Sequence, residues 1–182
     1  WDDKDLPLAV AIALAGIGRL LADTHRALPE GADALRSTVK GLLYDLASFT
    51  WPGWGAAGIV VSPAHAALGL GAAKANLALA EELGKGELAR ARAHWMLGAH
   101  LLSSGSPDVA GDEFRAAASL AEAAGSRPEV LLAEGFAALA RTATGDEAAE
   151  GMVTAVLAQL AELEGGEMFV EQIVTARTAL SV

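Results

Sequence analysis

The sequence contains no cysteine, and aromatic residues make up only 5% of the chain. Disulfides, thiolate nucleophiles, Fe–S clusters and cysteine-based zinc sites are therefore excluded. Charged residues are also few, at 20%, whereas hydrophobic residues reach 53%, which excludes an intrinsically disordered chain. A length of 182 residues is enough for one domain with a sizeable core.

Positive charge is scarce in the second half of the chain. Residues 108–182 carry four Lys/Arg against thirteen Asp/Glu, a balance of −9, whereas residues 1–107 carry nine against ten, a balance of −1. Because an acidic surface repels phosphate backbones, we expect no nucleic-acid partner.

Two long stretches lack charge. Residues 46–73 contain no Asp, Glu, Lys or Arg, but prolines and glycines interrupt them. The run LPLAVAIALAGIG (6–18) is shorter than a membrane span and has an acidic flank where a signal peptide needs a basic one. We therefore expect it to form a buried helix and expect no membrane partner. The start at Trp1 rather than Met leads us to expect a missing or processed N-terminus. The sequence does not establish the cellular compartment, although it favours a cytoplasmic location.

Helical patterns fill almost the whole chain, between regularly spaced breakers. They predict eight helices, at about 6–27, 33–49, 63–83, 87–104, 107–124, 127–144, 146–165 and 167–181. The run GIVV (58–61) is the only strand-like segment, and one such run cannot build a sheet. The sequence thus predicts an all-α fold of antiparallel helical hairpins.

We expect a single helical domain over residues 1–182, with four parts. Residues 1–62 hold the N-terminal helices and a glycine-rich loop, 63–90 a connecting helix, 91–164 repeat-like helices, and 165–182 a capping helix.

The segment 91–164 contains two copies of a small–large–small pattern. In the first copy Leu97-Gly98 and Leu101 are followed by Ala110, Phe114 and Ala117; in the second, Gly135 or Phe136 is followed by Ala148, Met152 and Ala155. This pattern resembles that of tetratricopeptide repeats, although the second glycine is one residue out of step. The resemblance implies a short α-solenoid, in which each hairpin buries its apolar face against the next.

The same resemblance implies an inner groove that binds a protein or peptide. Its lining residues would be Arg92, Trp95, Ala99, Leu102, Glu129, Leu132, Phe136 and Leu139. Two alternatives remain open: a carrier for a small apolar molecule, or a structural domain of a longer chain. Homo-oligomerisation is also left open.

The stretch WPGWGAAG (51–58) contains Gly53, Gly55 and Gly58 in the G-x-G-x-x-G spacing of dinucleotide-binding folds. That motif requires a preceding strand and a following helix. Here Pro52 precedes the first glycine, and IVVSP follows the last. We therefore interpret the stretch as a loop between helices. Trp51 or Trp54 is expected to pack onto neighbouring helices; alternatively, the two tryptophans form a partner-binding surface.

No catalytic pattern stands out, so we expect a non-catalytic protein without cofactor or metal. His94 and His100 are six residues apart and cannot share one helix face as metal ligands do. The rival hypothesis is an enzyme site assembled from scattered residues such as Asp45, His65 and His94.

Overall fold

The computed structural model describes residues 4–182, which form eight α-helices and one 3-10 turn; no strand occurs among them. The helices are α1 (Leu6–Thr24), α2 (Pro29–Phe49), α3 (Pro63–Glu82), α4 (Glu87–Ser103), α5 (Pro107–Ala123), α6 (Arg127–Ala143), α7 (Ala149–Ala161) and α8 (Glu167–Leu180), and the turn is η1 (Pro52–Trp54). The predicted all-α class and the number of helices are confirmed. The expectation drawn from Trp1 concerns a residue outside the described range.

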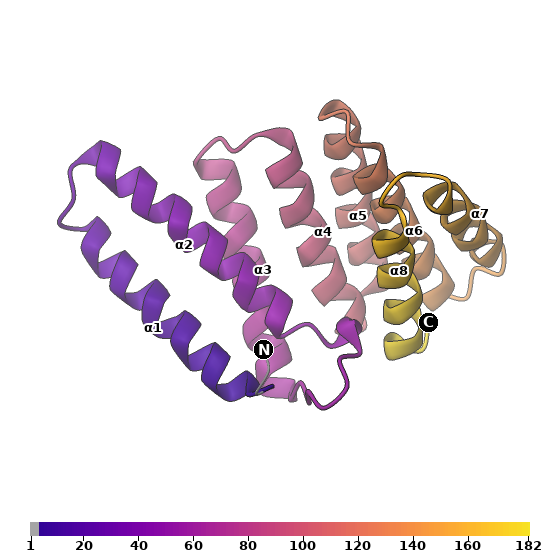
Figure 1. Cartoon of the computed structure of the whole chain (residues 1–182), viewed down its shortest axis with the longest axis horizontal. Helices are drawn as coiled ribbons and strands as arrows, with labels where there is room; N and C mark the ends of the chain where they lie inside the picture. The colour runs from indigo at the N-terminus through magenta and orange to yellow at the C-terminus, as the bar shows by residue number, and fades with distance from the viewer. Residues whose placement is uncertain (1–3) are drawn as a thin grey trace.

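Successive helices run antiparallel and stack side by side as a short α-solenoid (Figure 1). Each helix packs against the one before it and the one after it, and the even-numbered helices α2, α4, α6 and α8 also contact one another in turn. The single turn η1 lies between α4 and α8 and contacts both. The array therefore has two unlike ends, α1 at one and α7 with α8 at the other (Figure 1).

Local sequence signals explain where most helices begin. The Ser62 hydroxyl accepts a hydrogen bond from the His65 amide at 3.2 Å, and Pro63 occupies the first helical position, so α3 starts where the sequence predicts. By contrast, α2 begins at Pro29 rather than at residue 33. The preset φ of Pro29 starts this helix without any side-chain cap from Leu28.

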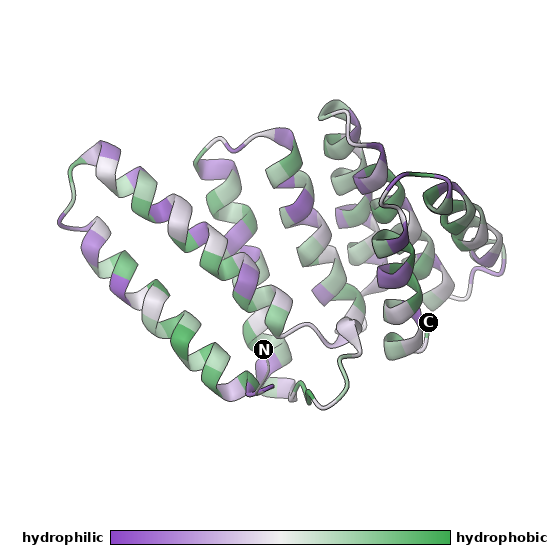
Figure 2. Cartoon of the chain, in the orientation of Figure 1, coloured by the Kyte–Doolittle hydropathy of each residue, from purple (hydrophilic) through white to green (hydrophobic). Residues whose placement is uncertain are grey.

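The helix α1 differs from the expectation of a buried helix. Four of its nineteen residues are buried, namely Leu6, Val10, Ala13 and Ile17. On the opposite side Leu8, Ile12, Leu14 and Leu21 are exposed. The reason is its place at the end of the array, where α2 covers one side and no element of the described chain covers the other (Figure 2).

The length of α1 also corrects the sequence analysis. The helix continues beyond Gly18 to Thr24, and it is long and apolar enough to cross a membrane by length and composition. Its length therefore does not exclude a membrane span, and the absence of a membrane partner stays a prediction.

Candidate functional site

The structure brings together the residues predicted to line the groove. They lie on the facing sides of α4 and α6, where the rings of Trp95 and Phe136 meet edge to face with centroids 5.1 Å apart. Phe114 of α5 adds a third ring, 5.4 Å from Phe136. The two repeat-like hairpins thus share one aromatic centre.

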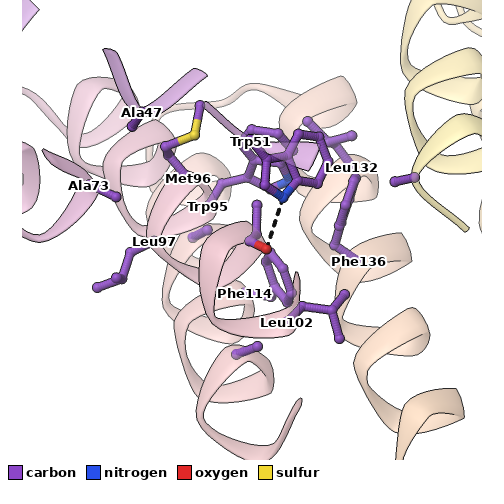
Figure 3. Close-up of a cluster of buried hydrophobic side chains, with 14 of the residues drawn as sticks. Ala47, Trp51, Ala73, Trp95, Met96, Leu97, Leu102, Phe114, Leu132 and Phe136 are labelled. Atoms are coloured by element: carbon purple, nitrogen blue, oxygen red, sulfur yellow. Dashed lines mark hydrogen bonds between the residues drawn. The ribbon is translucent and has the colours of Figure 1, made fainter. Parts of the chain in front are cut away.

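Most of these residues, however, do not line an open groove as we expected. Six of them are buried, with at most 5% of each residue exposed: Trp95, Ala99, Leu102, Leu132, Phe136 and Leu139. The chain itself covers them. The indole of Trp51 lies among Trp95, Leu132 and Phe136 (Figure 3). The last helix, α8, packs against α6.

The other two predicted groove residues lie at the edge of this core. Arg92 of α4 donates to the Glu129 carboxylate of α6, with Nη2 and Oε1 2.7 Å apart. The Arg92 side chain is 52% exposed and that of Glu129 only 13%. This ion pair joins the two repeat-like hairpins and leaves the guanidinium partly accessible.

Trp51 has the structural role that the sequence predicts. It is 1% exposed, and its Nε1 donates a hydrogen bond to the Ala99 carbonyl oxygen at 2.9 Å (Figure 3). The alternative of a partner-binding surface is therefore wrong for Trp51. Trp54 is half-buried, contacts the Trp51 ring edge to face at 4.9 Å, and donates to the Ser48 carbonyl oxygen.

Gly53, the first glycine of the G-x-G-x-x-G stretch, allows this packing. A Cβ atom on Gly53 would lie 2.2 Å from the Trp51 ring, so only glycine lets the chain fold over that ring. The stretch follows α2 and contains η1, and α3 begins five residues after Gly58. It is a loop between helices, as predicted.

An open pocket of about 450 Å³ lies beside this loop. Its walls are mostly apolar: Ser48, Phe49, Trp51, Pro52, Trp54, Gly55, Ala56, Ile59, Val60 and Val61. Val60 is 84% exposed. Within the described part of the chain, none of the residues lining the pocket is ionisable.

Sequence reasoning missed this pocket, although it noticed the apolar run GIVV. A single strand-like run cannot form a sheet, so the sequence analysis assigned no role to it. The signal in the sequence was the combination of two tryptophans and an apolar run in one loop, which could have indicated a binding surface.

Two histidines on α4 have partners within the fold. His94 Nδ1 lies 2.7 Å from a carboxylate oxygen of Glu113 on α5. His100 is buried, and its Nε2 donates to the Ala47 carbonyl oxygen at 2.9 Å. Burial lowers the pKa of His100 below its ordinary value, and the hydrogen bond to Ala47 only partly opposes that effect. His100 is therefore a neutral core residue at pH 7.

The ionisable residues of the rival enzyme hypothesis are not part of the pocket. Asp45, His65 and His94 are all absent from its described lining. Among residues 4–182, no three histidine, aspartate or glutamate side chains gather as a set of metal ligands.

Comparison with known proteins adds no relative: no family model, no curated protein and no solved structure matches this chain.

Proposed function

We propose that the chain is a non-catalytic helical-repeat module of tetratricopeptide-like design, which binds a large apolar side chain of a protein or peptide in the pocket beside η1. The observation that carries the proposal is the pocket itself. Its walls combine the half-buried indole of Trp54 with the apolar run Ile59–Val61, and it is open to solvent at Val60.

The position of the pocket follows from the occupation of the inner groove. The buried Trp51 ring packs against Trp95 and Phe136, two of the residues that we expected to line such a groove. Residues 55–61 then form an apolar surface next to the aromatic cluster that contains Trp51 and Trp54. A ligand side chain in the pocket would rest against Trp54, whose Nε1 already donates to Ser48. Recognition would thus depend on shape and apolar contact.

The acidic character of the chain favours a basic or neutral partner. The overall charge is −10, and most of it comes from residues 108–182. Such a field accelerates the approach of basic segments and slows that of acidic ones. We therefore expect preferred peptides to carry one large apolar residue next to lysine or arginine.

Selection from a displayed random-peptide library tests the proposal. We expect enriched peptides to share an apolar anchor and to lose at least about tenfold in affinity to a Val60→Glu variant, since a carboxylate at the mouth opposes burial of an apolar group. Val109→Glu is the matched control, because Val109 is an exposed valine of α5 outside the pocket lining. Peptides that bind both variants equally well would contradict the proposal.

A small apolar molecule is the second candidate ligand, and the size of the pocket favours it. About 450 Å³ lies within the range of roughly 300–1,000 Å³ found for small-molecule sites. Titration with Nile red, a neutral apolar dye, separates the two candidates. Saturable dye binding that Val60→Glu abolishes, together with no peptide enrichment, would favour the small molecule.

A further inference from the structure

The outer side of α1 is an apolar surface that the packing of the described array leaves uncovered. Ile12 is 65% exposed and Leu8 55%, and Leu14 and Leu21 are also exposed. Figure 2 shows hydrophobic colour along most of this helix, which lies at the edge of the array. A monomeric protein rarely exposes so continuous an apolar surface without a partner.

The exposed residues of α1 form a seam with heptad spacing. Steps of three and four residues connect five exposed positions: Leu8, Ala11, Ala15, Gly18 and Ala22. These steps are those of the a and d positions in paired helices. Four of the five side chains are small, so a second helix can approach to about 8 Å between axes. The exposed residues Ile12, Leu14 and Leu21 flank the seam.

Charge separates this end of the array from the other. Residues 4–50, which contain α1 and α2, carry five basic side chains (Lys4, Arg19, Arg26, Arg36 and Lys40) against five acidic ones, a balance of zero. Arg19 lies beside the seam and pairs with Asp23 of the same helix at 2.9 Å. A neutral surface of this kind attracts neither anionic lipid nor a highly charged protein.

We propose that this seam pairs with the same seam of a second copy of the chain, antiparallel about a twofold axis. The two seams are alike in charge and shape, and Ala15 of one copy would face Gly18 of the other, with Ala11 opposite Ala22. Antiparallel helix dipoles favour this orientation. The pairing closes at two copies, because each chain has one such end.

Pairing through α1 also keeps the acidic halves apart. Residues 108–182, with a balance of −9, include the far end of each array (Figure 1). In a dimer joined at α1 these two regions lie at opposite ends of the particle. The contact area is that of one helix face, so we expect a weak dimer in equilibrium with monomer.

Sedimentation equilibrium over a range of concentrations tests the dimer. We expect an average mass that rises toward twice 18.5 kDa. Ala15→Glu should raise the dissociation constant by at least about tenfold, because it buries a carboxylate in an apolar contact. Ala155→Glu, the same change at an exposed alanine of α7, should leave the mass unchanged. A wild-type chain that stays monomeric, or equal effects of the two variants, would overturn the proposal.

The absence of native cysteine allows a direct test of the orientation. In a mixture of Ala11→Cys and Ala22→Cys chains under mild oxidation, we expect disulfides to join one variant to the other. Few disulfides should join two chains of the same variant. A parallel pairing would instead link each variant to itself. Circular dichroism on each variant shows that the protomer stays folded, which is expected because both positions are exposed.

Vesicles of phosphatidylcholine with phosphatidylglycerol test the competing hypothesis that the seam binds lipid. We expect the wild-type chain to remain in solution when vesicles are floated through a density gradient. A chain that is monomeric and floats with the vesicles, and no longer does so as Ala15→Glu, would assign the seam to lipid and overturn the proposal.

Discussion

The α1–α2 end of the array and its centre at α4 and α6 differ in how the hydrophobicity of a helix relates to its burial. In α1, an apolar helix with only one exposed charged residue, four of nineteen residues are buried. In α4, which contains four ionisable side chains in its first half, nine of seventeen are buried. Position in the stack decides burial here, because a central helix has neighbours on several sides and the end helix has one.

Truncation of a large side chain at each place should show this contrast most strongly. Trp51→Ala removes a buried ring and its hydrogen bond to Ala99, and should lower the free energy of unfolding by about 3–5 kcal/mol. Ile12→Ala in α1 should change it by less than about 0.5 kcal/mol in the monomer. Chemical denaturation at low protein concentration measures both. Similar losses would show that α1 is as tightly packed as the centre.

Glycine-to-alanine substitutions sharpen the comparison, because their effects should differ in sign. A Cβ on Gly98 would lie 2.7 Å from the Phe114 ring, so Gly98→Ala should destabilise the fold by about 1–3 kcal/mol. Gly41 of α2 has no atom near its would-be Cβ, and Gly41→Ala should stabilise by up to about 1 kcal/mol. Thermal melting of the two variants would contradict this account if both melting temperatures moved in the same direction.

Acid should weaken the centre through His100. Its folded pKa is lowered by burial, so below pH 6.5 the unfolded chain binds a proton that the folded chain does not. This contribution to stability is therefore fully present above pH 6.5 and declines as the pH falls, with a slope of at most about 1.4 kcal/mol per pH unit.

The variant His100→Gln isolates that contribution, since its amide can still donate to Ala47 but does not titrate. Denaturation between pH 5 and 7 should show a shallower pH dependence for His100→Gln than for the wild type. The exposed His25, just after α1, is the control: His25→Gln should keep the wild-type slope. Equal slopes in all three proteins would refute the assignment to His100.

The smallest effect is expected at the edge of the centre, in the pair Arg92–Glu129. Half of the Arg92 side chain is in solvent, so a double-mutant cycle with Arg92→Ala and Glu129→Ala should give a coupling below about 1 kcal/mol. A larger coupling would mean that the two repeat-like hairpins depend on this pair as well as on their aromatic contacts.

Local chemistry made much of the fold predictable from the sequence. Ser62-Pro63 marks the start of α3, and Gly98 is the small residue that the close crossing with Phe114 requires. The same reasoning predicted that Trp51 or Trp54 packs inward. It could not predict that Trp51 packs against Trp95 and Phe136, because its hydrogen bond to Ala99 spans 48 positions of sequence.

The exposure of α1 and the pocket beside η1 were missed for related reasons. Hydropathy along a segment gives no information on how many neighbours the fold supplies, so the run 6–18 looked like a core helix. The pocket depends on how residues 55–61 lie against Trp54, which is set by a loop without a repeating pattern.

The hydrogen bond from Trp51 to Ala99 also has a kinetic consequence. Contacts between successive helices connect residues close in sequence, and such contacts form early and quickly during folding. The contact of Trp51 spans 48 positions, so we expect it to form after the contacts between successive helices. Removing the ring should therefore speed unfolding and leave the refolding rate nearly unchanged. Trp51 would then govern how long the native state lasts, and have little influence on how fast it is reached.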